Sequence, residues 1–382
     1  MNAPLYPLSA ILYPRRLLVR GVNWLGDAVM TTPALLRLRE ALPETHITLL
    51  TQEKQAGLWA GHPAVDEVTT FARKEGLFRV ARRLREGRFD TALVLPNSLR
   101  TGLEVWLAGI PRRIGYAGGW RDWLLTQAVP RRADVVEMRK RTVEEVRRLL
   151  THTQPAGSQT RAPAASHHLF HYLHLAAALG AKAELLAPHL AVSDAEVAAV
   201  KVKFSLPDGM LIGLNAGAEY GPAKRWPADR FIAAAKALRA RLNCGFVIFG
   251  GPADNALAAE IGAALAVSGP QSAVRVTSLA GRTSLRELCA ALRACRVVLT
   301  NDTGPMHIAA AVGTRVVAVF GSTSPELTGP GLPGDTRHIL LQGEAACSPC
   351  FLRECPIDFR CMNSLTVPAV VDAVERAAKE NL

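Results

Sequence analysis

One stretch of the sequence combines an apolar run with residues that can hold a phosphate. It reads Leu299-Thr-Asn-Asp-Thr-Gly-Pro-Met-His307, so Asp302, Thr303 and Gly304 stand where a helix would begin. A helix N-terminus presents backbone N–H groups without partners and a partial positive charge, and both attract anions. Gly304 lets a ligand approach the backbone, while Thr303 and His307 add polar groups. Asp and Thr are also ordinary N-caps, and His307 also fits a buried helix position, so this segment favours a pyrophosphate site and a plain capped helix equally.

A second loop offers a carboxylate. The stretch that follows the first apolar run, Gly21-Val-Asn-Trp-Leu-Gly-Asp27, places Gly26 and Asp27 just before a helical pattern. It is not the G-x-G-x-x-G fingerprint of dinucleotide-binding proteins, which argues against a dehydrogenase. An ionised Asp27 on the floor of a cleft would suit a general base that deprotonates an attacking hydroxyl. The alternative is that Asp27 is simply an N-cap.

Two further loops offer positive charge and another carboxylate. The loop from Asn215 to Pro227 carries Glu219 and the pair Lys224-Arg225, and positive charge there would stabilise a departing diphosphate. Its Trp226-Pro227 pair predicts a structural role, with Pro at the start of the next helix. The loop from Gly250 to Asp254 supplies Asp254, which fits a ribose hydroxyl or an N-cap equally well.

These loops follow short apolar runs that alternate with helical patterns. This alternation predicts two halves, each an α/β doubly wound parallel sheet. In such sheets ligands bind beyond the carboxyl ends of the strands, so we expect the loops of the two halves to face one another across a cleft. The predicted strands are 17–20, 47–50, 68–71, 91–95, 211–214, 246–249, 297–300 and 316–320. The predicted helices are 32–41, 77–86, 100–108, 168–179, 228–241, 253–265, 284–294, 305–312 and 367–378.

Composition sets the class of protein. The chain has 382 residues, of which 49% are hydrophobic, enough for two domains with separate cores. No apolar run approaches the ~20 residues of a membrane span. Residues 1–13 lack the basic start and the cleavage site of a signal peptide. Seven cysteines in a chain of this length do not form a disulfide framework, so we expect a cytoplasmic protein.

The net charge of +12 is concentrated in the first half. Residues 1–190 hold 26 Lys and Arg against 16 Asp and Glu, and the remainder holds 19 against 17. An anionic partner such as nucleic acid or a phosphorylated lipid head group would favour this distribution. The clusters lack interleaved aromatics, which argues against nucleic acid. Solvated helix faces are the remaining interpretation.

Two groups of residues have the composition of metal sites. Cys347, Cys350, Cys355 and Cys361 have spacing compatible with zinc or an iron–sulfur cluster, although the more favoured interpretation has no metal there. The histidines at 167, 168, 171 and 174 alternate with leucines, and a packed helix explains them better than a metal.

Taken together, the motifs resemble glycosyltransferase family 9, the heptosyltransferases of lipopolysaccharide core assembly, over most of the chain. The matching segments are Gly26 to Ala34, Gly217 to Pro227, Thr300 to His307 and Val319 to Pro325. The resemblance implies a GT-B fold, in which two Rossmann-like domains face each other across a cleft. It also implies an inverting transferase that takes heptose from ADP-L-glycero-beta-D-manno-heptose. The form of the segment 217–226 looks most like that of the transferases that add heptose to the first core heptose.

The resemblance also implies roles for individual residues. Asp27 would be the base, and Lys224 would carry the diphosphate charge without a divalent metal or other cofactor. The donor would be held by Asp302, Thr303, Gly304 and His307, with Asp254 a weaker candidate for the ribose. Gly26 and Glu219 complete the predicted substrate-binding set.

Partners and location follow from the same resemblance. The implied acceptor is the lipopolysaccharide inner core, Kdo2-lipid A carrying heptose, reached by peripheral contact with the cytoplasmic face of the inner membrane. No nucleic acid is expected. The alternatives are a family 9 transferase with another core acceptor, of the first or third heptosyltransferase type, and a noncatalytic protein that binds a nucleotide sugar or an anionic lipid.

The predicted domains are an acceptor-binding domain at 15–187, with an insertion at about 131–167, and a nucleotide-sugar domain at 188–365. A C-terminal helix within 366–382 would pack back on the first domain, as is common in GT-B folds. The leader of about fourteen residues and the insertion, rich in Pro, Ala, Ser and Thr at 151–166, depart from the family pattern.

Overall fold

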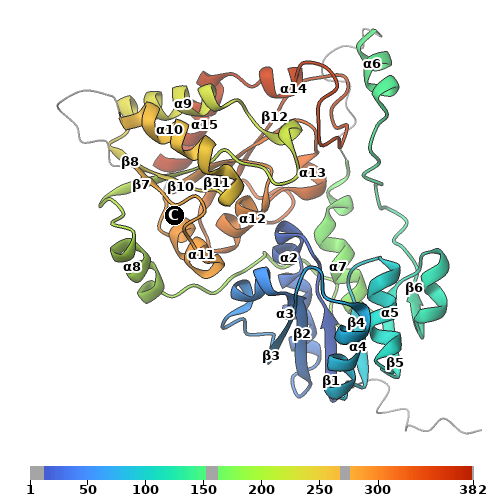
Figure 1. Cartoon of the computed structure of the whole chain (residues 1–382). Coiled ribbons are helices and arrows are strands. Elements are labelled where there is room, and N and C mark those ends of the chain that lie inside the picture. The colour runs from blue at the N-terminus through green and yellow to red at the C-terminus, as the bar shows by residue number, and fades with distance from the viewer. Residues whose placement is uncertain (1–12, 152–161, 267–275, 381–382) are drawn as a thin grey trace, which may run out of the picture. The chain divides into compact units, whose positions relative to one another are not determined.

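The fold was analysed in a computed structural model that describes residues 13–151, 162–266 and 276–380. The chain forms two compact units (Figure 1). The first contains the chain up to Val135 and His168–Ala191, and the second contains Val136–His167 and the chain from Val192 onward. Most of the predicted leader and the middle of the predicted insertion lie outside the described residues.

The first unit is built on a parallel sheet of order β3-β2-β1-β4-β5-β6. Its strands are β1 (Arg16–Arg20), β2 (His46–Gln52), β3 (Glu67–Phe71), β4 (Thr91–Val94), β5 (Arg112–Tyr116) and β6 (Gln127–Val129). Its helices are α2 (Leu25–Met30), α3 (Thr32–Ala41), α4 (Leu77–Glu86), α5 (Leu99–Leu107), α7 (His168–Ala177) and the 3₁₀ helices η1 (Glu53–Trp59) and η2 (Gly119–Leu124). The order reverses between β1 and β4, which makes their carboxyl ends the switch point of this sheet.

The second unit repeats this topology in the order β12-β11-β10-β7-β8-β9, again parallel. Its strands are β7 (Met210–Asn215), β8 (Cys244–Ile248), β9 (Val276–Ser278), β10 (Val297–Asn301), β11 (Arg315–Phe320) and β12 (Ile339–Gln342). Its helices are α6 (Val143–Thr151), α8 (Asp194–Lys203), α9 (Ala228–Arg241), α10 (Asn255–Ala266), α11 (Leu285–Arg293), α12 (Gly304–Ala311), α13 (Pro325–Thr328), α14 (Arg360–Asn363) and α15 (Val367–Lys379), with the 3₁₀ helices η3 (Ala164–Ser166), η4 (Pro222–Lys224) and η5 (Pro252–Asp254).

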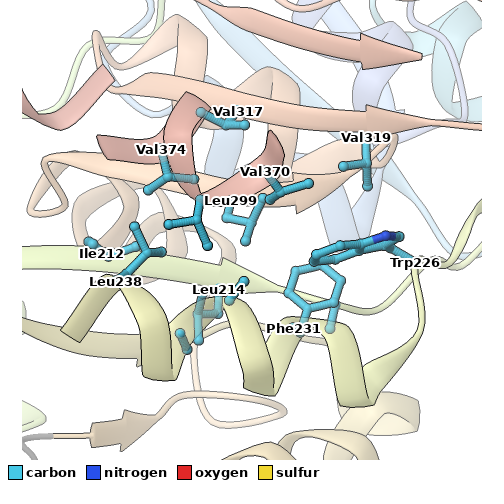
Figure 2. Close-up of a cluster of buried hydrophobic side chains, with 14 of the residues drawn as sticks. Ile212, Leu214, Trp226, Phe231, Leu238, Leu299, Val317, Val319, Val370 and Val374 are labelled. Carbon is cyan, nitrogen blue, oxygen red and sulfur yellow. The ribbon is translucent and has the colours of Figure 1, made fainter. Parts of the chain in front are cut away.

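The core of the second unit explains why its strands are apolar on both faces. Figure 2 shows Ile212, Leu299 and Val317 of the sheet together with Leu238 of α9 and Val374 of α15 in one buried cluster. Parallel sheets are covered by helices on both faces, so their strands are almost continuous runs of Val, Ile and Leu. This cluster fixes the central strands whose carboxyl ends carry the candidate site.

The predicted strands and helices all correspond to observed elements. The sequence did not predict four strands, the edge strands β6, β9 and β12 and the next-to-edge strand β5, because they are short or carry polar and glycine residues. The apolar periodicity of central strands is stronger because both of their faces are buried.

The C-terminal helix corrects one expectation. We expected it to pack on the first domain, but α15 packs against α9, β10, β11 and β12 of the second unit. Its Val370 and Val374 are fully buried, and Ala373 and Ala377 on the same stripe allow close approach to α9. The small residues make this face complementary to the sheet of its own unit.

The predicted insertion also belongs elsewhere than expected. Residues 136–167 are part of the second unit rather than of the first domain. The backbone N–H of Arg141 donates to the carbonyl of Cys350, and Val146 packs in one cluster with Cys347 and Cys350. Hydrogen bonds and apolar contacts distant in sequence cannot be inferred from the Pro-rich composition of the segment.

We predict that Leu238→Ala lowers the free energy of unfolding by about 2 to 5 kcal/mol, because it opens a cavity in a fully buried cluster. The exposed Val202 on α8 offers a control, since Val202→Ala should change that free energy by less than about 0.5 kcal/mol. Urea denaturation of both variants measures the difference. Equal effects would mean that the cluster does not support the unit.

Candidate functional site

The candidate site of the second unit lies at the switch point of its sheet. β7 and β10 are neighbours there, and Asn215 at the end of β7 pairs in register with Thr300 of β10. The Asn215 amide donates to the Thr300 hydroxyl at 2.9 Å and to the Thr303 hydroxyl at 3.4 Å. The loops that follow β7, β10 and β11 therefore meet at one edge.

A buried carboxylate joins these three loops. Asp302, which follows β10, is 4% exposed, and its Oδ2 lies 2.5 Å from Nζ of Lys224 on η4. The same oxygen accepts the hydroxyl of Thr323, from the loop after β11, at 2.6 Å. The predicted residues Lys224 and Asp302 are thus brought together as an ion pair. Thr323 was not predicted as a site residue, although it lies in a segment that carries the family resemblance.

The side chain of Asn301, at the end of β10, forms hydrogen bonds with the loop that follows β7. Its side chain is fully buried, and its Oδ1 accepts the backbone N–H of Trp226 at 3.0 Å. Its amide donates to the carbonyls of Ala216 at 2.7 Å and Gly217 at 3.3 Å. The loop that carries Lys224 is therefore tied to β10 at both of its ends. Trp226 has the predicted structural role, since it lies in the hydrophobic cluster of Figure 2.

The helix α12 begins directly after this ion pair. Gly304 is its first residue, Thr303 is its N-cap residue and His307 is buried one turn further on. The Thr303 side chain makes no capping hydrogen bond, and Asp302 binds Lys224 and Thr323 instead. The capped-helix alternative for this segment is therefore wrong as far as side-chain capping is concerned.

Two cations, Lys224 and Arg353, contact the ring of Tyr220. The Lys224 ammonium is 4.9 Å from the centre of the Tyr220 ring, and the Arg353 guanidinium is 5.1 Å from it. The Tyr220 hydroxyl donates to the carbonyl of Phe351 at 2.8 Å, which fixes the ring. Sequence reasoning missed Tyr220 and Arg353, because 133 positions separate them and no local motif links them.

Asp254 lies against the same loop but is occupied locally. Its Oδ2 accepts the backbone N–H of Gly251 at 3.0 Å, and its Oδ1 is 3.7 Å from Arg225. A Cβ on Gly217 would lie 2.5 Å from this carboxylate, so a larger residue there would displace the Asp254 side chain. Glu219 is exposed on the same loop. Asp254 thus lies beside the site and binds the N–H of Gly251, the N-cap residue of η5, and its contact with a ribose hydroxyl stays a prediction.

The first unit carries Gly26 and Asp27. The helix α2 begins at Leu25, so Asp27 lies in its first turn rather than at its N-cap, which is Trp24. The Asp27 side chain is 24% exposed, and its Oδ1 is 3.4 Å from Nδ1 of His168 on α7. The buried Tyr172, one turn further along α7, also interacts with Asp27. Burial, and next the negative charge of Asp27, raise the pKa of Tyr172 well above its usual value.

Buried polar contacts hold the loop that precedes Asp27. Arg20 at the end of β1 pairs with Glu104 at 2.8 Å, and both side chains are almost fully buried. Another guanidinium nitrogen of Arg20 donates to the carbonyl of Gly21 and to Asn23 Oδ1. The amide of Gln55 donates to the Asn23 carbonyl at 2.8 Å. The loop is therefore fixed on two sides before α2 begins.

The histidines of α7 form part of the packing of the first unit. His171 stacks on Tyr116 with ring centres 4.0 Å apart, and the Tyr116 hydroxyl lies 2.9 Å from Nδ1 of His174. Burial, with a further contribution from His168, lowers the pKa of His171 to about 3, so its ring is neutral at pH 7. The helical packing predicted for this segment is confirmed, and the contact of His168 with Asp27 is new.

The four C-terminal cysteines lie around one small cavity in the second unit. Burial raises the pKa of Cys347 and Cys350, and it raises that of Cys361 to about 12. In the described ranges, no group of three or more His, Cys, Asp or Glu side chains is placed to hold a metal ion. The raised pKa values favour the neutral thiol form of Cys347, Cys350 and Cys361.

The two sheets and the polar clusters at their switch points define a GT-B glycosyltransferase. Residues 77–359 match the family described as glycosyltransferase family 9 (heptosyltransferase), and the chain belongs to this family. The chain is therefore a glycosyltransferase of the heptosyltransferase kind. This confirms the resemblance seen in the sequence.

Curated relatives refine the similarity. Lipopolysaccharide heptosyltransferase 2 of Salmonella typhimurium is 33% identical over 82% of this chain and 85% of its own length. The protein of the same name from Escherichia coli K12 is 32% identical over the same shares of the two chains. The structure of E. coli ADP-heptose lps heptosyltransferase II superposes with a TM-score of 0.72 at 27% identity, covering 95% of this chain and 98% of that one. The chain is thus similar to heptosyltransferase II.

We predict that Asn301→Ala lowers the free energy of unfolding by at least about 2 kcal/mol, because it leaves buried backbone groups of Trp226 and Ala216 without their partner. Asn363 is exposed and makes one such bond, so Asn363→Ala is the control and should cost less than about 1 kcal/mol. Chemical denaturation compares the two. Similar losses would show that Asn301 does not anchor the loop.

Proposed function

We propose that this enzyme transfers heptose from ADP-heptose to the first heptose of the lipopolysaccharide inner core, with inversion at the anomeric carbon. The observation that carries the proposal is the Lys224, Asp302 and Thr323 cluster at the switch point of a sheet in a family 9 chain. Relatives named heptosyltransferase 2, matched over more than four fifths of their length, support the choice of acceptor.

In this proposal the donor binds to the second unit. The pyrophosphate lies at the N-terminus of α12, where the backbone N–H groups of the first turn, the Thr303 hydroxyl and Gly304 face it. Lys224 and Arg353 both lie against the Tyr220 ring and neutralise the charge that develops on the leaving diphosphate. His307 contacts the sugar phosphate, and Asp254, Glu219 and Gly217 border the nucleoside.

The acceptor binds to the first unit beside Asp27. Asp27 accepts the proton of the attacking hydroxyl, whose oxygen forms the new bond to the anomeric carbon of heptose. The bond from that carbon to the diphosphate breaks, and the electron pair leaves with ADP. His168 and Tyr172 orient the carboxylate from α7, and Gly26 leaves room for the sugar. The proposed acceptor is Kdo2-lipid A that carries heptose, on the cytoplasmic face of the inner membrane.

We predict that Asp27→Asn lowers kcat by about 10² to 10⁴, because the amide cannot accept the hydroxyl proton, while ADP affinity stays unchanged. Transfer from ADP-heptose to a one-heptose core acceptor, read by product mass, measures kcat, and calorimetry measures ADP binding. Glu44 is an exposed carboxylate of the same unit, and Glu44→Gln is the control. Full transfer by Asp27→Asn would reject Asp27 as the base. If the wild-type protein itself bound ADP but transferred no heptose, the noncatalytic alternative would be favoured.

We predict that Lys224→Ala weakens ADP binding by about tenfold or more, because a charge-assisted contact with the diphosphate is lost. The change also leaves Asp302 without its ion-pair partner, so thermal melting must show that the variant is folded at the assay temperature. Lys236 is exposed on α9, and Lys236→Ala is the charge-matched control. Unchanged ADP affinity in a folded Lys224→Ala protein would contradict the assignment.

We predict that His168→Gln and Tyr172→Phe each lower kcat by about tenfold with little change in the acceptor KM, because they misorient Asp27 without touching the acceptor. The double variant with Asp27→Asn should lose little more than Asp27→Asn alone, since the three residues act as one unit. Additive losses would assign His168 and Tyr172 roles independent of Asp27.

A further inference from the structure

One short helix of the first unit exposes its aromatic side chains and buries its arginine, the reverse of the usual distribution. The 3₁₀ helix η2 exposes Trp120 and Trp123, which are 87% and 60% exposed, while Arg121 between them is 3% exposed. Residues three apart eclipse one another in a 3₁₀ helix, so both indoles lie on one face. The Arg121 side chain points inward and donates to Asn97 Oδ1 at 3.1 Å. Burial lowers the pKa of Arg121, and among the residues that the structure describes two of its guanidinium nitrogens find no hydrogen-bond partner, which is a cost for the fold.

A third tryptophan extends this face. Trp106 of α5 is 42% exposed, and its ring lies 5.6 Å from that of Trp123 in an edge-to-face contact. Gly102 of α5 lets the two helices approach, because a Cβ there would lie 3.0 Å from Leu124. We call Trp106, Trp120 and Trp123 the tryptophan face. Grouped exposed aromatics of this kind mark an interaction surface.

The segment that carries the tryptophan face is rich in arginine. Residues 77–132, which contain α4, α5 and η2, hold eleven Arg, including the buried Arg121, and no Lys against four Asp and Glu. Arg85 donates to the carbonyl of Leu107, next to Trp106. A guanidinium nitrogen of Arg131 lies 3.9 Å from the place of a Cβ on Gly118, next to the start of η2. Indole rings prefer the boundary between water and acyl chains, and cationic side chains are drawn to anionic lipid head groups. Within the described residues, no helix is long and apolar enough to cross a bilayer.

We infer that the tryptophan face docks the first unit on an anionic lipid bilayer, with the indoles inserted among the head groups and the surrounding arginines against the lipid phosphates. This inference rests on the proposed function in one respect, namely that the proposed acceptor is a lipid. η2 follows the carboxyl end of β5. The loop that carries Asp27 follows the carboxyl end of β1, so both segments lie on the same side of this parallel sheet. Docking would thus bring the carboxyl ends of these strands, where the acceptor is proposed to bind beside Asp27, to the membrane surface.

The test is binding of the full chain to vesicles by cosedimentation and by the blue shift of tryptophan fluorescence. The vesicles contain phosphatidylethanolamine with phosphatidylglycerol, and vesicles of phosphatidylcholine alone are the neutral comparison. The double variant Trp120→Ala with Trp123→Ala should lower the partition coefficient on the anionic vesicles by at least about tenfold, because each indole loses its burial in the interface. Val202→Ala, which removes an exposed apolar side chain of the second unit, should bind like the wild type.

Transfer to a water-soluble truncated core acceptor separates this inference from the proposed function. The double variant should retain wild-type kcat and KM on that acceptor, whereas Asp27→Asn should lose transfer and still bind vesicles. Equal vesicle binding by the double variant and the wild type would overturn the inference. It would also be overturned if the double variant lost transfer to the soluble acceptor, which would place the tryptophans in the substrate site. A wild-type dimer that the double variant converts to a monomer would assign the face to a second copy instead.

Discussion

The ion pair between Lys224 and Asp302 is the interaction on which the site of the second unit depends. It connects the loop after β7 with the start of α12, and Thr323 adds the loop after β11 to the same carboxylate. A buried ion pair contributes little net stability, but the loss of one partner is costly because the other charge stays buried. The pair therefore acts mainly as a positioning device: it fixes the cation against Tyr220 and next to the first turn of α12.

The first unit also positions its candidate site residue with buried contacts, but these contacts differ from those of the second unit. A buried Arg20 and Glu104 pair holds the loop before α2, while Asp27 receives its contacts from α7, a helix more than 140 positions away in the sequence. Asp27 remains partly exposed, whereas its partner Tyr172 is buried. This arrangement suits a base, because the carboxylate is fixed on one side and open to a substrate on the other. The two units thus share one topology and place different chemistry at equivalent strand ends.

The tryptophan face adds a cost that the fold alone does not explain. An arginine is buried and two indoles are exposed on one short helix, so both kinds of side chain lie where they are less stable. Functional surfaces are where such local conflicts are expected, because the gain appears only when the partner binds.

The sequence by itself determined the parallel α/β class, the central strands and most helices, because burial on both faces imposes an unbroken apolar pattern. It also determined the family, and it predicted Lys224, Asp302 and Thr303 as site residues, since these residues lie in short segments that follow strands. Only the tertiary structure decided that Asp302 is an ion-pair partner rather than a cap, and that α15 packs in the second unit. It likewise revealed the contacts of Arg353 with Tyr220 and of His168 with Asp27. These contacts join residues far apart in the chain, and their geometry depends on side-chain packing that no local pattern encodes.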